Sequence, residues 1–294
     1  MTELSTALGL RLRRFLAKST SEKFESLSYR LRALLPTRPQ TIQLPFGVRW
    51  QPLDSALDHQ LMAGTFENAE ANFVARFLGP GMTVLDVGAH HGFYTLVAST
   101  RVGASGTVVA FEPSPRERKR LERHLRLNHC QNVRVVPMAL GLGPGRAQLH
   151  LVEGAEDYCN SLRPPVVASR TRPVPVEVTS LDAFLAKARI ARVHLVKLDI
   201  EGAELDALKG ATKLLGTQPR PLLMVEAYDL RTRPWGYAAS EIVRLLDTLS
   251  YQCCELLDGG IARPIDAHRT TYDANLVAVP LEKLADFLNH QGAQ

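Results

Sequence analysis

The sequence has few cysteines and no long hydrophobic run, and both shortages exclude structural classes. Its 294 residues include only four cysteines, and none of them has the spacing of a metal or redox motif. No apolar run approaches the roughly 18 residues that a membrane-spanning helix needs. The first residues, Met1–Lys18, place their charges after apolar residues and lack the pattern of a secretory signal. We therefore expect a cytoplasmic protein with reduced thiols.

Most of the chain also lacks an excess of either charge. The net charge is +5, and residues 1–40 hold eight basic and three acidic side chains, whereas the remainder has equal numbers of each. The neutral remainder gives no electrostatic reason to expect a nucleic acid partner. Within residues 1–36, apolar side chains recur at helical spacing between arginines, which predicts a basic amphipathic extension. Such a helix packs on its own domain, on a second copy of the chain, or on an anionic membrane surface as a peripheral contact.

The composition of the rest predicts one large α/β domain. A hydrophobic content of 45% is enough for a sizeable core at this length. Residues 1–40 form the extension and a proline-bearing linker, and residues 41–65 form a lead-in with a small strand pair within Ile42–Trp50. Residues 66–294 make up the domain itself, in which the glycine- and proline-rich segment 141–180 is a variable insert.

The stretch GMTVLDVGAHHG, residues 81–92, predicts a ligand-binding turn. Thr83–Val87 is apolar and β-branched apart from Asp86, as expected of a buried strand. Gly88 and Gly92 permit positive φ angles and a close backbone approach before a helix that begins near Phe93. In an open α/β sheet, ligands bind at this point, beyond the carboxyl end of the first strand.

An acidic residue ends the second apolar strand. Glu112 follows Thr107–Phe111, and a carboxylate at this place accepts hydrogen bonds from a ribose diol. Alternatively, Glu112 serves the start of the helix that begins near Ser114. The glycine loop has neither of the common phosphate-binding patterns, so a nucleoside without a pyrophosphate is the better match.

Carboxylates also cluster after the fourth and fifth expected strands. The fourth strand, Val193–Leu198, runs into Asp199 and Glu201, and strand alternation places Lys197 on the same side as both. The fifth strand ends in Glu226. Charged groups on a buried strand are costly unless they are paired or functional, so either catalysis or an internal ion pair of Lys197 explains them.

Three motifs carry a family resemblance. LDVGAHHG and VVAFEPSP resemble the first two motifs of class I S-adenosylmethionine-dependent methyltransferases, and VKLDIEGAELDALKGA resembles the signature of the FkbM family within that class. The resemblance covers about residues 66–280 and implies a seven-stranded, doubly wound Rossmann-like sheet with an antiparallel last strand, here with an N-terminal helical extension. It disfavours a nicotinamide dehydrogenase, which has a third loop glycine.

The resemblance implies S-adenosyl-L-methionine as the cofactor and a set of residues that contact it. The third strand, Asn132–Leu140, is expected to end beside the adenine at Met138 and Ala139. The implied cofactor contacts are Asp86, Gly88, Ala89, His90, Gly92, Glu112, Pro113, Ala139 and Asp199.

The implied activity is methylation of a hydroxyl group on a sugar, a glycan or lipid, or a secondary metabolite. N-methylation of a small molecule, or cofactor binding without catalysis, are the alternatives. Because a hydroxyl nucleophile must lose a proton, Asp199, Glu226 and His91 are candidate bases. Asp199, Glu201 and Glu226 are instead suited to a hard cation such as Mg²⁺, and the sequence does not choose between these roles.

Overall fold

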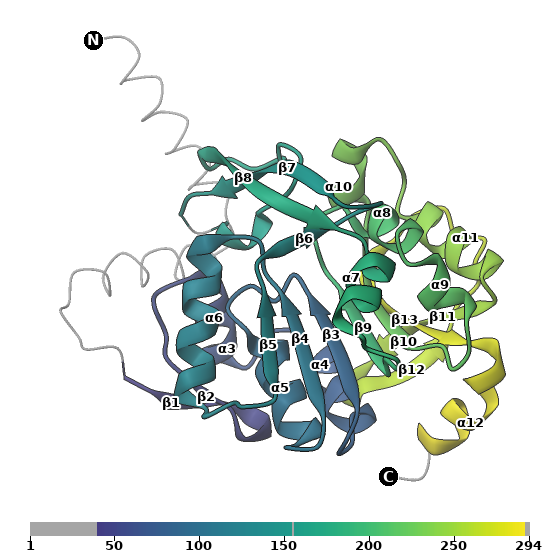
Figure 1. The fold of residues 1–294 in the computed structure, drawn as a ribbon. Helices are drawn as coiled ribbons and strands as arrows, with labels where there is room; N and C mark the ends of the chain where they lie inside the picture. The colour runs from purple at the N-terminus through teal and green to yellow at the C-terminus, as the bar shows by residue number, and fades with distance from the viewer. Residues whose placement is uncertain (1–39, 155, 292–294) are drawn as a thin grey trace.

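The computed structural model describes residues 40–154 and 156–291, and a mixed sheet forms its centre (Figure 1). Its strands are β3 (Thr83–Val87), β4 (Thr107–Phe111), β5 (Val133–Val136), β9 (Leu195–Leu198), β10 (Leu222–Tyr228), β11 (Tyr251–Leu257), β12 (Ile261–Pro264) and β13 (Asp273–Pro280). The strand order is β12-β11-β13-β10-β9-β3-β4-β5. From β5 to β10 neighbouring strands are parallel, whereas β13 is antiparallel to both β10 and β11. The Rossmann-like sheet and its antiparallel last strand are therefore confirmed.

The expected number of seven strands is wrong by one. The additional strand is β12, which pairs with β11 through the register Leu257 to Ile261. Gly259 and Gly260 make this tight hairpin with φ angles of +73° and +77°. β12 has only four residues, of which Ala262 alone is buried, so its alternation is too short to predict a strand.

Helices cover both faces of the sheet. One face packs against α4 (Asn68–Phe77), α5 (Phe93–Val102), α6 (Pro115–Leu127) and α12 (Leu281–Gln291). The other packs against α7 (Leu181–Ala188), α8 (Glu204–Lys209), α9 (Thr212–Gly216) and α11 (Ser240–Thr248). Val84 belongs to the first core and its neighbour Leu85 to the second, because successive strand residues face opposite sides. This alternation gives two hydrophobic cores on one sheet, as in a doubly wound fold.

The lead-in is part of the first core. β1 (Ile42–Gln43) and β2 (Arg49–Trp50) form the expected strand pair, and α3 (Ala56–Ala63) follows, a helix that the sequence analysis did not predict. Trp50 is fully buried, stacks on His124 of α6 at 3.8 Å, and donates a hydrogen bond to Asp58 at 2.7 Å. Asp58 and Ser55 cap each other at the start of α3.

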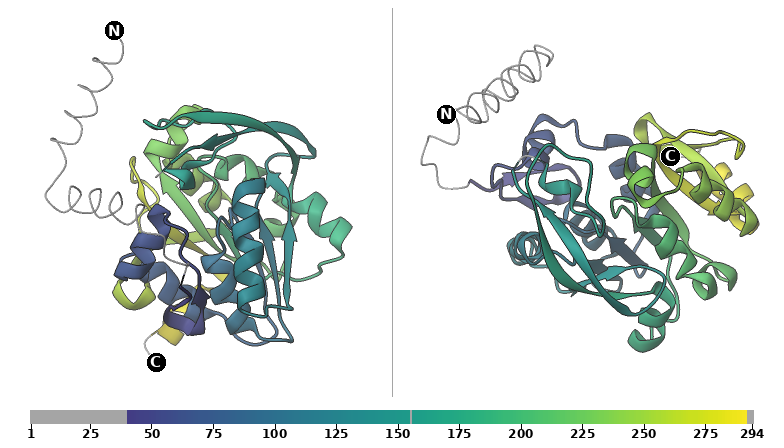
Figure 2. Two further views of the ribbon diagram at one scale, coloured as in Figure 1. Left: turned by 90° about the vertical axis from the view of Figure 1, so that its left-hand side faces the viewer. Right: turned by 90° about the horizontal axis from the view of Figure 1, so that it is seen from above.

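The insert forms a second, smaller sheet. Its strands β6 (Met138–Leu140), β7 (Gly145–Val152) and β8 (Thr171–Thr179) have the order β6-β8-β7, and the 3₁₀ helix η2 (Asp157–Cys159) lies between the last two. The third strand was expected to be one continuous segment, Asn132–Leu140, but it is divided at Pro137. β5 stays in the main sheet, and β6 joins the second sheet. Figures 1 and 2 show this small sheet lying across the carboxyl ends of the parallel strands.

The basic extension, residues 1–36, lies outside the described residues, so its helical character and its peripheral contacts stay predictions. Among residues 40–154 and 156–291, no helix is both long enough and apolar enough to cross a membrane.

Candidate active site

A cavity of about 520 Å³ opens at the carboxyl ends of β3, β4, β9 and β10, beneath the small sheet. This volume lies within the range of small-molecule and cofactor pockets. Its lining joins three groups of residues: Gly88, Ala89 and His90 of the glycine loop; Glu112, Pro113, Met138 and Ala139 beside that loop; and Lys197, Asp199, Glu201, Glu226, Tyr228 and Arg231 at the ends of β9 and β10. Seven of the nine expected cofactor contacts therefore line one cavity.

The glycine loop folds closely onto its own chain. Gly88 has a φ angle of +82°, and a Cβ atom there would lie 1.9 Å from the carbonyl oxygen of Asp199. Gly92 begins α5 with a φ angle of +94°, and a Cβ atom there would lie 2.4 Å from a methyl carbon of Leu121. Gly92 does not line the cavity. The expected positive φ angles are present, but the close approach that requires glycine is to the chain itself.

Asp86 lies beneath the loop and does not line the cavity, so the structure does not support direct contact with a cofactor. It is 1% exposed and accepts a hydrogen bond from the Thr95 hydroxyl at 2.5 Å. This bond joins the end of β3 to the first turn of α5. Burial raises the pKa of the Asp86 carboxyl. Its position indicates that Asp86 orients the loop.

Glu112, at the end of β4, serves the start of α6 as one alternative expected, whereas its contact with a ribose diol stays a prediction. It lines the cavity, and its Oε2 atom accepts a hydrogen bond from the His90 backbone N–H at 2.7 Å. Its Oε1 atom accepts from the Ser114 backbone N–H at 2.8 Å, just before α6. Burial raises the pKa of Glu112 to about 8. Each oxygen has one protein donor and keeps a second lone pair for a ligand hydroxyl.

Three carboxylates meet at the opposite end of the cavity. Asp199, Glu201 and Glu226 each offer an oxygen within 4.8 Å of the other two. Lys197 donates to Asp199 at 2.9 Å and Arg231 pairs with Glu201 at 3.0 Å, whereas Oε2 of Glu226 has no hydrogen-bond partner. Burial, together with Asp199 and Glu201, raises the pKa of Glu226 well above its ordinary value. Burial likewise raises the pKa of Glu201 to about 8.

Lys197 and Asp199, at the end of β9, form an ion pair. An internal ion pair of Lys197 was one of the two explanations expected for the charged residues of this strand. Lys197 is 5% exposed, and its ammonium lies 4.8 Å from the centre of the Tyr94 ring. Asp199, Asp86 and Glu67 outweigh burial and raise the pKa of Lys197. β9 is the direct neighbour of β3, with Asp86 in register with Lys197. Asp199 is therefore held beside the glycine loop.

The turn after β9 is fixed by the insert and by the segment after β10. Glu201 has a φ angle of +55°, which is uncommon for a residue with a side chain. Its carbonyl oxygen accepts hydrogen bonds from the Ser161 hydroxyl at 2.7 Å and from the Trp235 indole at 3.1 Å. These two hydrogen bonds hold the backbone of Glu201 in its uncommon conformation, and the residue lines the cavity.

Several residues of the cavity are not among the site residues expected from the sequence. Glu67 directly precedes α4, accepts a hydrogen bond from the Tyr94 hydroxyl at 2.6 Å, and lines the cavity with it. Burial and the charge of Asp199 raise the pKa of Glu67 to about 7. Tyr228 ends β10 and Arg231 lies just beyond it. Ligands bind at the carboxyl ends of parallel strands, and this rule would have found both residues. No sequence signal pairs Glu67 with Tyr94, because only the packing of α4 on α5 brings them together.

The geometry does not support His91 as a catalytic base. Its side chain is 1% exposed, is absent from the cavity lining, and lies 2.8 Å from the Glu117 carboxylate. Burial and Arg120 lower the pKa of His91 to about 3. His90 contributes to the lining, and its ring stacks on that of His91 at 3.7 Å.

Comparison with known proteins assigns the family. Residues 86–253, more than half of the chain, match the family model of the Methyltransferase FkbM domain. The chain belongs to this family. The family is one of S-adenosylmethionine-dependent methyltransferases, in agreement with the sequence resemblance.

The individual relatives of this FkbM-domain chain are distant. "Methyltransferase 1" of Beauveria bassiana is 30% identical over 147 residues, which are 43% of this chain and 57% of the relative. "Hexuronic acid methyltransferase AglP" of Haloferax volcanii is 28% identical over 137 residues, which are 44% of this chain and 50% of the relative. The chain thus spans about half the length of the curated relatives it matches. The crystal structure of Methyltransferase FkbM from Methylobacillus flagellatus KT is 18% identical, with 76% of this chain and 52% of that chain covered and a TM-score of 0.43.

Proposed function

We propose that this FkbM-domain protein transfers a methyl group from S-adenosylmethionine to a hydroxyl group of a sugar-containing small molecule, glycan or lipid. The observation that carries the proposal is that one cavity has two chemically different ends. The glycine loop and Glu112 form the end suited to a nucleoside, and the carboxylates of Asp199, Glu201 and Glu226 form the end suited to an acceptor that loses a proton.

The residues of the first end fit the cofactor. Glu112 has two buried oxygens, each with one backbone donor, which leaves acceptor capacity for a ribose diol. Met138 and Ala139 offer an apolar surface and backbone groups beside it. When bound, S-adenosylmethionine supplies an electrophilic methyl group on a sulfonium with a neutral leaving group. The protein's contribution is then to orient the acceptor and to exclude water.

Glu226 is the proton acceptor that the geometry supports best. Glu226 lines the cavity, its buried Oε2 atom has no hydrogen-bond partner, and burial raises its pKa. A general base needs a free lone pair directed at the acceptor hydroxyl, which favours the unpartnered Glu226 over a carboxylate held as an ion pair. Asp199 accepts a hydrogen bond from Lys197 and is therefore less available to take a proton from the acceptor. We propose that Asp199 orients the acceptor.

A divalent cation such as Mg²⁺, held by Asp199, Glu201 and Glu226, is the alternative for this end of the cavity. Carboxylate oxygens suit a hard cation, and the three groups are close enough to share one. Activity measured after chelation, and again after Mg²⁺ is restored, separates the two roles. Unchanged activity in the chelator supports direct proton transfer to Glu226.

The sugar-containing acceptor rests on two observations. One relative is named a hexuronic acid methyltransferase. The cavity lining also includes two aromatic rings, Tyr158 and Tyr228, and the guanidinium of Arg231, a combination that suits a sugar ring with polar or anionic substituents. Analysis of the product by mass spectrometry and NMR distinguishes O-methylation from N-methylation.

Calorimetry with S-adenosylmethionine, its demethylated product and NAD tests the proposal first. We expect micromolar binding of the first two and no binding of NAD. A screen of uronic acids, neutral glycosides and hydroxylated natural products follows, with formation of the demethylated cofactor as the readout. Tight binding of NAD, or binding without turnover on any hydroxylated acceptor, would contradict the proposed activity.

A further inference from the structure

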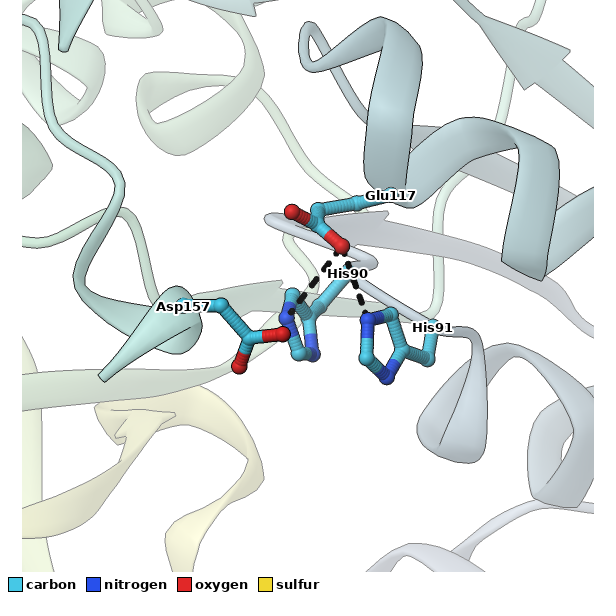
Figure 3. Close-up of side chains that lie close together, drawn as sticks. All are labelled: His90, His91, Glu117 and Asp157. Atoms are coloured by element: carbon cyan, nitrogen blue, oxygen red, sulfur yellow. Dashed lines mark hydrogen bonds and ion pairs between the residues drawn. The ribbon is translucent and has the colours of Figure 1, made fainter. Parts of the chain in front are cut away.

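Four side chains gather from three separate elements beside the glycine loop. His90 and His91 lie between β3 and α5, Glu117 lies in the first turn of α6, and Asp157 lies in η2 of the insert. Each offers one nitrogen or oxygen atom, and these atoms lie within 4.8 Å of one another. Figure 3 shows both imidazole rings below the Glu117 carboxylate, with the Asp157 carboxylate directed toward them. Apart from His90, these residues do not line the cavity.

The cluster is buried, and its polar atoms are not all satisfied. His91, Glu117 and Asp157 are 1%, 0% and 4% exposed. Nε2 of His90 and Oδ1 of Asp157 are buried and have no hydrogen-bond partner. The nearest charged group to Nε2 of His90 is Oε2 of Glu117, at 3.9 Å. Unpaired polar atoms in a water-poor site are costly, and a cation would give both a partner.

The surroundings of Glu117 direct one of its oxygens at the histidines. Its Oε1 atom accepts hydrogen bonds from Arg116 at 2.5 Å and from Asn160 at 3.3 Å. Its Oε2 atom consequently faces the two imidazoles, with Nε2 of His91 at 2.8 Å. Hydrogen bonds to the outer oxygen of a carboxylate are how proteins orient such ligands toward a metal.

Arg120 places positive charge against the same atoms. Its NH1 group lies 2.9 Å from Nε2 of His91 and 3.3 Å from Oδ2 of Asp157. One imidazole nitrogen cannot both accept from Arg120 and donate to Glu117, so one of its two contacts is unsatisfied. The Arg120 side chain is 24% exposed and has solvent to move into. A cation that replaced this guanidinium would satisfy every member of the cluster.

We propose that His90, His91, Glu117 and Asp157 bind one divalent transition-metal ion of the zinc class in place of Arg120. Two imidazole nitrogens and two carboxylate oxygens form a four-coordinate set, and the nitrogens select such an ion over Mg²⁺ or Ca²⁺. Bonds of about 2.0–2.1 Å would bring tetrahedral ligand atoms to roughly 3.3 Å from one another. The cluster reaches this spacing by a small contraction once Arg120 withdraws. The two carboxylates balance the charge of the ion.

The ion would fasten the insert to the cofactor loop. Its ligands join the β3–α5 loop, α6 and η2, which are otherwise connected here by side-chain hydrogen bonds and ion pairs. The role is structural, because three of the four ligands are absent from the cavity lining. The proposal is therefore independent of the proposed methyl transfer.

Metal titration of the full chain tests the proposal. The protein is stripped with a chelator and then titrated with Zn²⁺ and with Co²⁺, whose visible absorption reports four-coordinate geometry. We expect one ion per chain by elemental analysis and a higher melting temperature with Zn²⁺. His91→Asn and Asp157→Asn should each weaken binding by at least about tenfold. His268→Asn, an exposed histidine of the same chain, is the matched control and should bind as the parent does.

The variant Arg120→Met separates a metal site from a simple ion-pair network. It removes the competing charge while it keeps most of the side-chain volume, so we expect tighter Zn²⁺ binding, with circular dichroism as the check on folding. Absence of a stoichiometric ion in the parent, or weaker binding in Arg120→Met, would overturn the proposal. So would loss of the ion in Glu226→Gln but not in His91→Asn, because the ion would then belong to the acidic end of the cavity.

Discussion

Single carboxyl groups decide the chemistry of the cavity. Burial raises the pKa of Glu67 to about 7 and that of Glu112 to about 8, and it raises the pKa of Glu226 well above its ordinary value. These groups are protonated more readily than exposed carboxyls, because the charged form loses its hydration. A ligand that brings positive charge or hydrogen-bond donors into the cavity therefore changes their ionisation when it binds.

Glu112→Ala is expected to weaken binding of S-adenosylmethionine by about 1–3 kcal/mol, the cost of losing two hydrogen bonds to a buried carboxyl group. The reason is that its two oxygens line the cavity and have spare acceptor capacity. Isothermal titration calorimetry measures the change. Glu122→Ala on α6, outside the cavity lining, is the control and should bind normally. Equal affinity in the two variants would remove Glu112 from the cofactor site.

Glu226→Gln should bind the cofactor nearly as the parent does and lose about 10²-fold or more in methyl transfer, the scale typical of removing a general base. Asp199→Asn should lose less, because Asp199 is held by Lys197 and orients the acceptor. Both substitutions keep the size of the side chain. Single-turnover rates with an identified acceptor provide the measurement. If Asp199→Asn loses the larger factor and Glu226→Gln is almost fully active, the roles are reversed.

Glu67→Gln should change how stability depends on pH. Because the folded pKa of Glu67 is about 7, above the ordinary value of 4.5, the folded protein holds this proton more tightly than the unfolded chain does. Its stabilising contribution is complete at low pH and is lost as pH rises toward and through about 7. The variant should therefore gain stability relative to the parent between pH 5 and pH 8, on the order of 1–3 kcal/mol. Urea unfolding at several pH values tests this, and a constant difference would contradict it.

At the level of elements, the site depends on how closely three connections approach one another. The β3–α5 loop packs against the turn after β9, and α5 begins against Leu121 of α6. Ser161 of the insert and Trp235 after β10 hold the turn after β9 by hydrogen bonds to the Glu201 carbonyl. Displacing any one of these elements would therefore move both ends of the cavity.

Gly88→Ala should destabilise the fold by about 2–4 kcal/mol and abolish cofactor binding, because the new methyl group would lie 1.9 Å from a backbone oxygen. Gly64→Ala is the matched control: its φ angle is also positive, at +66°, but no atom lies within 4 Å of the added Cβ. The control should lose only about 1 kcal/mol, from backbone strain. Thermal and urea unfolding measure both. Similar losses in the two variants would show that strain, and not the clash, dominates.

On the scale of the whole molecule, one continuous body extends from the lead-in to α12. Leu44, Val48 and Trp50 share a hydrophobic core with α4, α5 and α6, and partly buried residues of α12 pack against the same core. The lead-in therefore behaves as part of the domain and not as a separate unit. The small sheet of the insert has a core of its own, centred on Leu149 and Leu151.

Removal of residues 1–36 should leave a folded protein that still binds the cofactor, because the described core begins at Leu44. Removal of residues 1–65 should prevent folding, since it deletes the fully buried Trp50 and its hydrogen bond to Asp58. Circular dichroism and calorimetry of the two truncated chains test this. An unfolded chain after the shorter truncation would show that the basic extension belongs to the core.

The sequence by itself determined the sheet, its glycine loop and the carboxylates that end its strands. Buried parallel strands read as short apolar runs, and their carboxyl ends necessarily meet, so Glu112, Asp199 and Glu226 could be assigned to one edge before any coordinates. The pattern of apolar runs did not predict β12, a short strand at the sheet edge. It also did not predict the break at Pro137, which divides one apolar run between two sheets.

Only the tertiary structure decided which of these groups are paired and which face the cavity. Asp86, His91 and Gly92 lie within the motif but are turned to the interior, whereas Glu67 and Arg231 enter the cavity from outside it. The cluster of His90, His91, Glu117 and Asp157 combines three elements separated by up to 67 positions in the chain. Local propensity encodes strands and turns, but such encounters depend on packing between elements, which no local pattern carries.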